Sequence, residues 1–409
     1  MMRKIIKWGL LFAAAVFTCQ VHRKKKEKSG LNWNAYTKSL LGLSKAGEDR
    51  KAYFDELRCL ASVLVILVHG MRAAAQRPEI AGSALWYGFV GGSGLGLCCN
   101  LLFVLISGAL LIPYREEGIG TFYQKRLMKV AVPLAAYYIF YLHRSGLVSF
   151  SLSSLGYAVK QILTGPMELV PHFWLVYVFI QLYIGVPLLR WMVKNMPEAV
   201  LTKLAGLMVL GMGVKTGLSL GGITLGVSVS WFSWEGIFLL GYWLSIQQSS
   251  ACDRAVYLGG GISGVVILLI QCFFPAWADA AVNDSLFMVL FSMAVFLFFL
   301  RRSPGQGRGR IWTQGINVIS RYSFSILMVH WFMLFVVVEN HLHIGPEMFG
   351  GSWMLFGVLL QSVLALLASL VFAVIYDNTV VLLAEQAVGI LCRILGRCCR
   401  QKQKGGSGR

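Results

Sequence analysis

Charged side chains are scarce in this sequence. Only 13% of its 409 residues are charged and 57% are hydrophobic, whereas a soluble domain is about a quarter charged and nearer half apolar. The connections between apolar segments are too short to fold alone, and the chain lacks the internal repeat that many transport folds carry. The scarcity of charge excludes a soluble enzyme and favours an all-α, polytopic membrane protein. The absence of a repeat argues against a transport fold built on repeats.

The sequence also lacks a disulfide framework and a metal-binding motif. Four of its nine cysteines, Cys59, Cys98, Cys99 and Cys272, lie in apolar runs, where a thiol packs as a small buried hydrophobe. The adjacent pair Cys98 and Cys99 has no metal-ligand spacing around it. We therefore expect no metal site.

Acidic residues are the rarer charge. The chain has 18 Asp and Glu against 37 Lys and Arg, for a net charge of +19. Such an excess could indicate nucleic-acid binding. However, the connections between the apolar segments alternate between basic and nearly neutral, and the basic set holds 27 Lys and Arg whereas the other set holds four. By the positive-inside rule, the basic connections face the cytoplasm. The charge therefore encodes membrane topology, and we expect no nucleic-acid partner.

Hydropathy and flanking charge predict about ten membrane spans, each near the ~20 residues that cross a bilayer core. Both ends of this bundle are predicted to be cytoplasmic, with 52–385 as the transmembrane domain and 386–409 as a basic cytoplasmic tail. The predicted spans are 54–76, 93–113, 130–148, 171–193, 203–220, 231–248, 255–275, 285–300, 316–339 and 352–383.

An N-terminal segment, residues 1–51, precedes this domain. Its apolar part, Trp8–Cys19, has the length of a signal-peptide core. Cleavage would leave the Lys-rich stretch 21–51 outside, against the charge rule, so an extra or interfacial helix and an over-long start are alternatives. The stretch 21–51 is predicted to be a flexible cytoplasmic connection near the anionic inner leaflet.

The first predicted span begins with Arg58 and reaches His69 through an apolar run. On a helix, eleven residues turn ~1100°, within ~20° of three full circles, and rise ~16 Å. Arg58 and His69 therefore share one face, and His69 lies near the middle of the ~30 Å hydrocarbon core. An ionisable residue at that depth indicates function, although a buried hydrogen-bonded histidine is the simpler interpretation.

A second histidine, His330, lies in the ninth predicted span, nine residues after Arg321. The two spans run in the same direction, so both histidines are predicted at similar depth above cytoplasmic arginines. Imidazole can act as a base at physiological pH. A catalytic role and a structural or substrate-positioning role for His330 both stay open, and sequence does not say whether the helices are neighbours.

Three cations, Lys125, Arg126 and Lys129, lie in the predicted cytoplasmic hairpin 114–129. They are either a stop-transfer cluster or an anion site for a phosphorylated donor, since Lys and Arg are the natural partners of phosphate.

One acidic residue, Glu235, lies in the outer part of the sixth predicted span. It either pairs with a cation such as Lys215 or Arg144, or lies near a site for an acceptor.

Five motifs follow one another between residues 52 and 383. They are Asp55–Arg58 through His69, Phe103–Gly108, Lys125-Arg126 with Pro133, His172–Trp174 with Tyr177 and Tyr183, and Ser323–His330. Together and in this order they resemble the integral membrane acyltransferase family 3, which comprises bacterial O-acyltransferases of surface polysaccharides. The Arg, ten residues, His spacing is the most specific of them.

The resemblance implies acyl transfer, most often of acetyl from acetyl-CoA, to a hydroxyl group of an extracytoplasmic or lipid-linked glycan. Acyl-CoA would be a co-substrate, with no permanently bound cofactor, and the protein would span a bacterial cell membrane several times. His69 would be the catalytic residue, as general base or through an acyl-histidine. The resemblance also implies that Arg58, Lys125 and Arg126 help to bind the donor. From the residues themselves we add Arg58 and His330 as catalytic candidates, Lys129 for the donor, and Ser107, Ser323 or Arg58 as donors to the oxyanion.

Two other functions remain as alternatives. A transporter or flippase of a glycan or lipid intermediate could use His69 and His330 as a proton relay. A membrane sensor or assembly partner would carry the motifs as relics and would not bind the donor. The acceptor and the oligomeric state are beyond what this sequence specifies.

Overall fold

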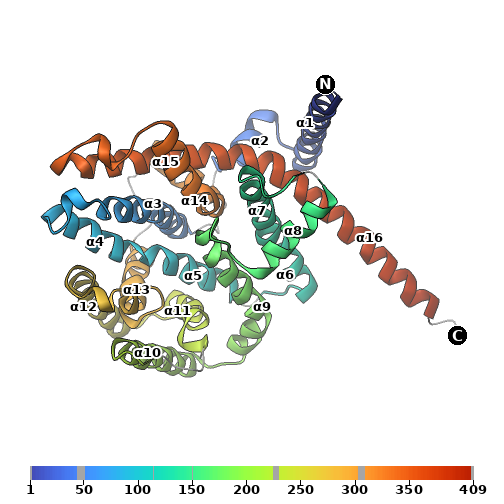
Figure 1. Cartoon of the computed structure of the whole chain (residues 1–409). Coiled ribbons are helices and arrows are strands. Elements are labelled where there is room, and N and C mark those ends of the chain that lie inside the picture. The colour runs from blue at the N-terminus through green and yellow to red at the C-terminus, as the bar shows by residue number, and fades with distance from the viewer. Residues whose placement is uncertain are drawn as a thin grey trace. The chain divides into compact units, whose positions relative to one another are not determined.

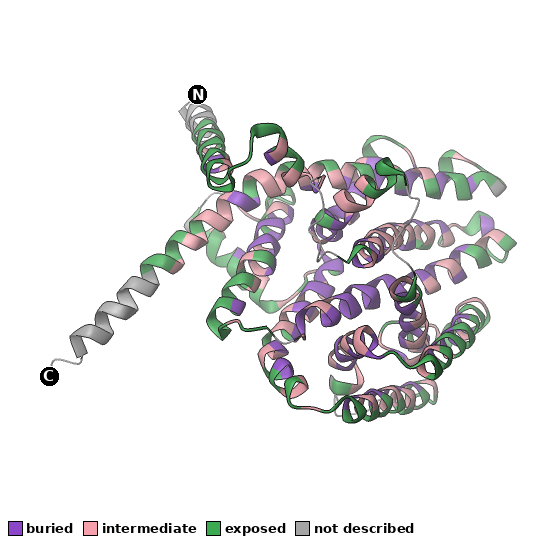
Figure 2. Ribbon diagram, turned by 180° about the vertical axis from the view of Figure 1, so that it is seen from behind, coloured by how far each residue is buried: buried purple, intermediate pink, exposed green. Residues whose placement is uncertain are grey.

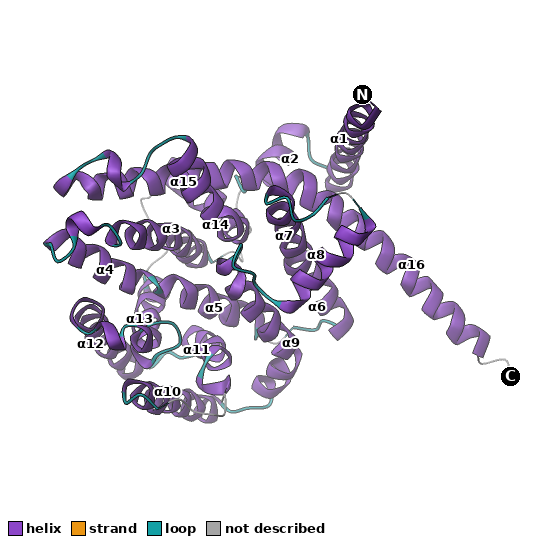
Figure 3. Cartoon of the chain, in the orientation of Figure 1, coloured by secondary structure: helices purple, strands orange, loops and turns teal. Residues whose placement is uncertain are grey.

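The computed structural model describes residues 2–43, 51–113, 115–149, 151–223, 230–302 and 309–406. In these ranges all regular structure is helical and no strand occurs (Figure 3). The all-α class predicted from composition is therefore confirmed.

The α-helices carry the labels of Figure 1. They are α1 Met2–Ser29, α2 Trp33–Leu40, α3 Ala52–Ala75, α4 Ala84–Gly96, α5 Cys98–Leu111, α6 Ile119–Arg126, α7 Val132–Arg144, α8 Leu152–Thr164, α9 Trp174–Lys194, α10 Glu198–Leu220, α11 Trp234–Ile246, α12 Ser250–Phe273, α13 Leu286–Arg301, α14 Arg310–Trp331, α15 Met354–Tyr376 and α16 Leu382–Gly406. Three π-helical segments extend them: η2 Leu127–Ala131, η7 Phe332–His341 and η10 Asp377–Val381. Single 3₁₀ turns are η1 Pro78–Ile80, η3 Pro171–Phe173, η4 Ser230–Phe232, η5 Pro275–Trp277, η6 Asp279–Ala281, η8 Pro346–Met348 and η9 Gly351–Trp353.

Serine side chains cap the first turns of four of these helices. The hydroxyl groups of Ser83, Ser151, Ser249 and Ser285 accept hydrogen bonds from backbone N–H groups in the first turns of α4, α8, α12 and α13. Each satisfies one of the amides that a helix leaves without an internal partner, which places the helix start at that residue.

Seven helical stretches in the described part of the chain are long and apolar enough to cross a membrane, which confirms a multi-pass membrane protein. Three predicted spans, 130–148, 231–248 and 285–300, correspond to α7, α11 and α13, which are helical but only 13, 13 and 16 residues long. The ten-span topology stays a prediction. The seven stretches are Ala52–Ala75, Ala84–Leu111, Pro171–Lys194, Glu198–Leu220, Ser250–Phe273, Arg310–Met348 and Met354–Ile394.

The second span starts earlier than predicted, at Ala84 instead of 93, because the glycine-rich end of α4 is helical. A Cβ atom on Gly94 would lie 2.6 Å from Cγ of Gln271, and one on Gly96 would lie 2.6 Å from Cγ2 of Val68. Missing side chains thus allow α4 to approach α12 and α3 closely.

The stretch 21–51 was predicted to be flexible, and in its described part this is wrong. α1 continues to Ser29 and α2 follows it. Nε2 of His22 lies 2.8 Å from the carbonyl oxygen of Asn378, and its Nδ1 lies 3.0 Å from the hydroxyl of Tyr36. Since a carbonyl only accepts, Nε2 donates and Nδ1 accepts from the tyrosine. These bonds order a segment whose composition alone suggested a solvated connection.

The chain divides into two compact units. Unit 1 comprises 1–45, 118–176 and 371–409, and unit 2 comprises 46–117 and 177–370. In unit 1, the hydroxyl of Tyr137 donates to Asp377 at 3.0 Å and that of Tyr376 donates to the carbonyl of Ala136 at 2.8 Å. These two bonds join α7 to the end of α15 and to η10.

α5 forms the core of unit 2, where nearly all of its side chains are buried (Figure 2). It packs against α3, α11 and α13. Its contact with α11 depends on two glycines, since a Cβ atom on Gly108 would overlap the carbonyl of Phe238, and one on Gly241 would overlap the carbonyl of Leu105. The two backbones therefore touch directly, as in small-residue helix interfaces of other membrane proteins.

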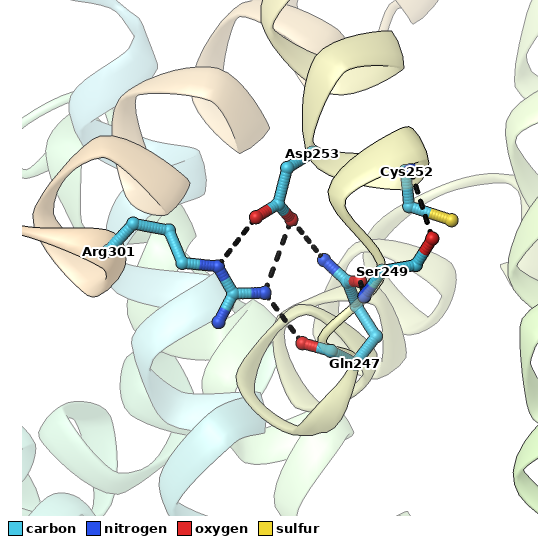
Figure 4. A network of polar contacts seen from close by, with 5 residues as sticks. All are labelled: Gln247, Ser249, Cys252, Asp253 and Arg301. Atoms are coloured by element: carbon cyan, nitrogen blue, oxygen red, sulfur yellow. Dashed lines mark hydrogen bonds and ion pairs between the residues drawn. The ribbon is translucent and has the colours of Figure 1, made fainter.

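A polar clamp, formed by Gln247, Asp253 and Arg301, joins helices of the same unit. Arg301, at the end of α13, donates from Nε to Asp253 at 2.8 Å and from Nη2 to the carbonyl of Gln247 at 2.6 Å (Figure 4). The Gln247 side chain donates to the same carboxylate at 2.6 Å. The clamp ties the connection between α11 and α12 to α13, and charge-assisted bonds of this kind are the stronger ones in proteins.

We expect Gly108→Ala to destabilise the protein by at least the ~1–3 kcal/mol that overpacking costs, because the obstacle is backbone and cannot rotate away. Thermal unfolding in detergent measures the effect. Gly88→Ala is the matched control, since Gly88 lies on α4 with nothing within 4 Å of the new Cβ. Equal melting temperatures for the two variants would contradict the close α5–α11 contact.

Candidate functional site

The structure brings the two predicted histidines together. α3 and α14 pack side by side in unit 2 (Figure 1). The imidazole rings of His69 and His330 stack with centroids 5.2 Å apart and an interplanar angle of 26°. His330 is fully buried, and His69 is half-buried. A pair predicted only to share a depth is thus a direct contact between neighbouring helices.

Neighbouring groups on α14 fix the orientation of this pair. Nδ1 of His330 lies 2.8 Å from the carbonyl oxygen of Leu327. Since the carbonyl only accepts, Nδ1 is a nitrogen that carries a proton. The indole of Trp331 meets the His69 ring edge-on, at 4.8 Å between centroids and 79°. His69 is therefore held between an imidazole face and an indole.

Arg58 takes part in a polar contact between the start of α3 and the middle of α14. Its Nη1 lies 3.4 Å from Oδ1 of Asp55, and the same oxygen accepts a 2.6 Å hydrogen bond from the hydroxyl of Ser320. Asp55 and Ser320 are buried. The aspartate thus joins α3 to α14 and holds Arg58, whose side chain stays partly open to ligand.

The two serines predicted for the oxyanion, Ser107 and Ser323, lie on different helices, α5 and α14. Ser107, on α5, lies 3.4 Å from the hydroxyl of Tyr183 on α9. Ser323 is buried on α14, seven residues before His330, which places it on the same face but ~10 Å away along the axis. Ser323 therefore lies toward the Arg58 end of α14, not at the level of the histidine pair.

The predicted donor cations belong to unit 1. Lys125 and Arg126 end α6, and Lys129 follows in η2. The guanidinium of Arg126 lies over the ring of Phe122, 5.5 Å from its centroid. Crowding by surrounding protein, and then repulsion from Arg126 and Lys125, lowers the pKa of the Lys129 ammonium group. A bound anion would relieve this repulsion.

Glu235 does not pair with Lys215, one of the two cations suggested for it. Lys215 forms its ion pair with Asp284, which also accepts from Ser233. The Gln181 side chain donates a short hydrogen bond to Glu235 instead. Asp284 was not predicted as the partner of Lys215, because it lies in a connection between apolar segments.

An acidic residue at the end of the ninth predicted span belongs to none of the five motifs. Glu339 lies in η7, in the same candidate span as His330, and pairs with Arg77 at 3.7 Å. The rule that flags intramembrane ionisable groups applies to it as it does to His69. Its apolar neighbours, Phe332–Val338, could have drawn attention to it.

Unit 1 also contains an apolar groove of about 360 Å³. It offers no acid, base or nucleophile beyond one tyrosine, whose hydroxyl already donates to a backbone carbonyl. The groove therefore lacks the groups that acid–base chemistry requires. The groove is lined by Leu127, Ala131, Val132, Ala135, Ala136, Ile139, Tyr376, Val380, Ala384 and Val388.

The fold and the stacked histidines define the class of protein: it is a multi-pass helical membrane protein with paired ionisable groups inside its bundle. A family model described as an acyltransferase domain, of the acyltransferase 3 type, matches residues 51–377. The chain belongs to this family and is a membrane acyltransferase, which confirms the resemblance drawn from five motifs. No curated protein and no solved structure matches it.

A double-mutant cycle tests the Asp55–Ser320 contact. Asp55→Ala and Ser320→Ala should each cost ~1–3 kcal/mol of stability, because each leaves a buried partner unsatisfied. Their coupling energy should be at least ~0.5 kcal/mol, as expected for residues in contact. Chemical or thermal unfolding of the purified protein measures all four species.

Glu116→Ala is the control for this cycle. Glu116 is an exposed acidic residue of the same unit, and its loss should change stability by no more than ~0.5 kcal/mol. Strictly additive effects of Asp55→Ala and Ser320→Ala would show that the contact does not form.

Proposed function

We propose that this acyltransferase moves an acyl group, most simply acetyl, from cytoplasmic acyl-CoA to a hydroxyl group of an extracytoplasmic or lipid-linked glycan, with His69 as general base. The observation that carries the proposal is the stacking of half-buried His69 on fully buried His330, within an acyltransferase 3 domain. A bacterial cell membrane is the setting that this chemistry and the charge pattern suggest.

The depth of His69 suits a reaction that joins substrates from opposite sides of a membrane. It lies eleven residues after Arg58 on α3, ~16 Å along the axis, so a group entering at the Arg58 end reaches it near the middle of the bilayer core. The pantetheine arm of acyl-CoA is long and thin enough to span such a distance. The acceptor would approach from the opposite end of α3.

The reaction needs only one base and an oxyanion site. His69 accepts the proton of the acceptor hydroxyl, whose oxygen attacks the thioester carbonyl carbon to form a tetrahedral intermediate. When the intermediate collapses, the C–S bond breaks, a new ester C–O bond remains, and the CoA sulfur receives the proton from His69. His330 and Trp331 hold the His69 ring in place during both proton transfers.

The donor end requires cations. CoA carries a pyrophosphate and a 3′-phosphate. In unit 1 the mutually repelling Lys125, Arg126 and Lys129 are suited to phosphate, and in unit 2 the partly exposed Arg58 is suited to it separately. The proposed topology, with about ten spans and both ends cytoplasmic, assigns Arg58 and the hairpin 114–129 to the donor's side of the membrane.

The stacking geometry favours this proposal over a proton-relaying transporter or flippase. Rings that lie nearly parallel at 5.2 Å present their faces to each other, whereas proton transfer between imidazoles needs an N–H edge directed at a nitrogen lone pair. A flippase would move its substrate without an acyl donor and would respond to a proton gradient.

His69→Ala should lower acetyl-CoA turnover by ~10²–10⁴-fold, the range that general-base catalysis contributes. Release of free CoA thiol by protein in lipid nanodiscs measures this. His143→Ala is the matched control, since His143 is an exposed histidine in unit 1 and its loss should leave turnover within two-fold of wild type. Turnover by His69→Ala at the wild-type rate would refute the role of His69.

Lys125→Gln combined with Arg126→Gln should raise the KM for acetyl-CoA by about ten-fold or more, because each lost charge-assisted bond is worth ~1.5–3 kcal/mol. With 3′-dephospho-acetyl-CoA the increase should be smaller if these cations bind the 3′-phosphate. Lys160→Gln removes an exposed cation from α8 and is the control. An unchanged KM in the double variant would contradict donor binding by Lys125 and Arg126 and would leave them the role of a stop-transfer cluster.

A further inference from the structure

A polar cluster lies at the end of α3 that is farthest from Arg58. Arg77, two residues after α3, pairs with Glu339 at 3.7 Å and with Glu347 of η8. Glu339 lies in the π-helical segment η7, nine residues after His330. π-Helical segments often occur at functional sites, because the wider turn turns side chains out of their regular positions. All three residues belong to unit 2, as the histidine pair does.

α15 contributes buried polar side chains to the same region. Nε2 of Gln361 donates to Glu339 at 2.9 Å, and Gln361 is fully buried. Its Oε1 and the hydroxyl of Ser362 are buried without a hydrogen-bond partner among the described residues. Leaving such atoms unsatisfied costs free energy comparable to a hydrogen bond, so their presence needs an explanation.

The position of Gly70 shows that this cluster lies close to His69, the proposed base. It follows His69 directly, and a Cβ atom there would lie 3.3 Å from Oγ of Ser362 and 3.8 Å from Oε1 of Gln361. The two unsatisfied oxygens therefore lie beside the backbone turn that carries His69. A row of polar groups runs from that turn through Gln361 to Glu339 and Arg77.

The chemistry of this row fits hydroxyl groups and not an anion. It combines two carboxylates with one guanidinium, so it carries an excess of negative charge. The amide oxygen of Gln361 and the Glu339 carboxylate accept hydrogen bonds, and the Ser362 hydroxyl can donate or accept. Vicinal hydroxyl groups of a sugar provide the matching donors and acceptors.

We propose that Glu339, Gln361 and Ser362, with Arg77 holding the Glu339 carboxylate, form the subsite that binds the hydroxyl groups of a saccharide acceptor. This inference rests on the proposed acyl transfer, to which it adds the acceptor's place: next to Gly70, on the side of His69 away from Arg58. The hydroxyl to be acylated then points back toward His69 while its neighbours bind Gln361 and Glu339.

The test separates use of the acceptor from use of the donor. Protein in nanodiscs receives radiolabelled acetyl-CoA together with de-esterified surface glycan prepared from the producing cells by mild alkali. Label in the glycan measures transfer, and label released as acetate measures hydrolysis, in which water takes the acceptor's place. Glu339→Gln and Gln361→Met are the variants, because both nearly keep side-chain volume, and thermal unfolding confirms that each is folded.

The ratio of transfer to hydrolysis should fall at least ten-fold in both variants, with a raised KM for glycan. Glu79→Gln, an exposed glutamate on η1 close in sequence to Arg77, should keep the wild-type ratio. An unchanged ratio in folded Glu339→Gln and Gln361→Met overturns the subsite while leaving acyl transfer intact. A wild-type protein that neither transfers nor hydrolyses overturns the proposed function, and the subsite with it.

Discussion

The contact between α3 and α14 is the constraint on which the rest of this structure depends. A membrane interior penalises ionisable groups, yet α3 carries Asp55 and His69 and α14 carries His330, and the segments that follow these helices carry Arg77 and Glu339. Packing the helices together compensates for that penalty, because the groups meet each other: carboxylate with serine, imidazole with imidazole, guanidinium with carboxylate. The row of contacts follows the helix pair from one end to the other and includes the proposed catalytic base.

The surrounding helices keep this pair rigid. Backbone contact through Gly108 and Gly241 fastens α11 to α5, and α5 in turn packs on α3. Catalysis by a positioned base requires the reacting groups to stay within a fraction of an ångström of their places. A scaffold in which helices touch through their backbones has little freedom to drift.

Part of the site could be predicted because it depends on the spacing of residues along single helices. The apolar run between Arg58 and His69 predicted the helix that carries both residues, and His330 was placed on a second helix by the same reasoning. The direction of these helices in the membrane and the depth of the histidines stay predictions. Adjacency could not be predicted, since spacing along one helix says nothing of which helix lies beside it. The Asp55–Ser320 and Lys215–Asp284 pairs join distant segments. The order in 21–43 likewise depends on a bond from His22 to Asn378.

Chemical rescue tests the central claim most directly, because it asks whether the missing function of His69 is that of a base. Acetyl-CoA turnover by His69→Gly is measured in nanodiscs, without any ion gradient, at increasing concentrations of free imidazole. Without imidazole we expect turnover to be lower than that of the wild type by ~10²–10⁴-fold, and with imidazole a rate that rises with its concentration and follows the titration of the added base. Turnover by the variant at the wild-type rate without imidazole, or dependence of the wild-type protein on a proton gradient, would contradict the account.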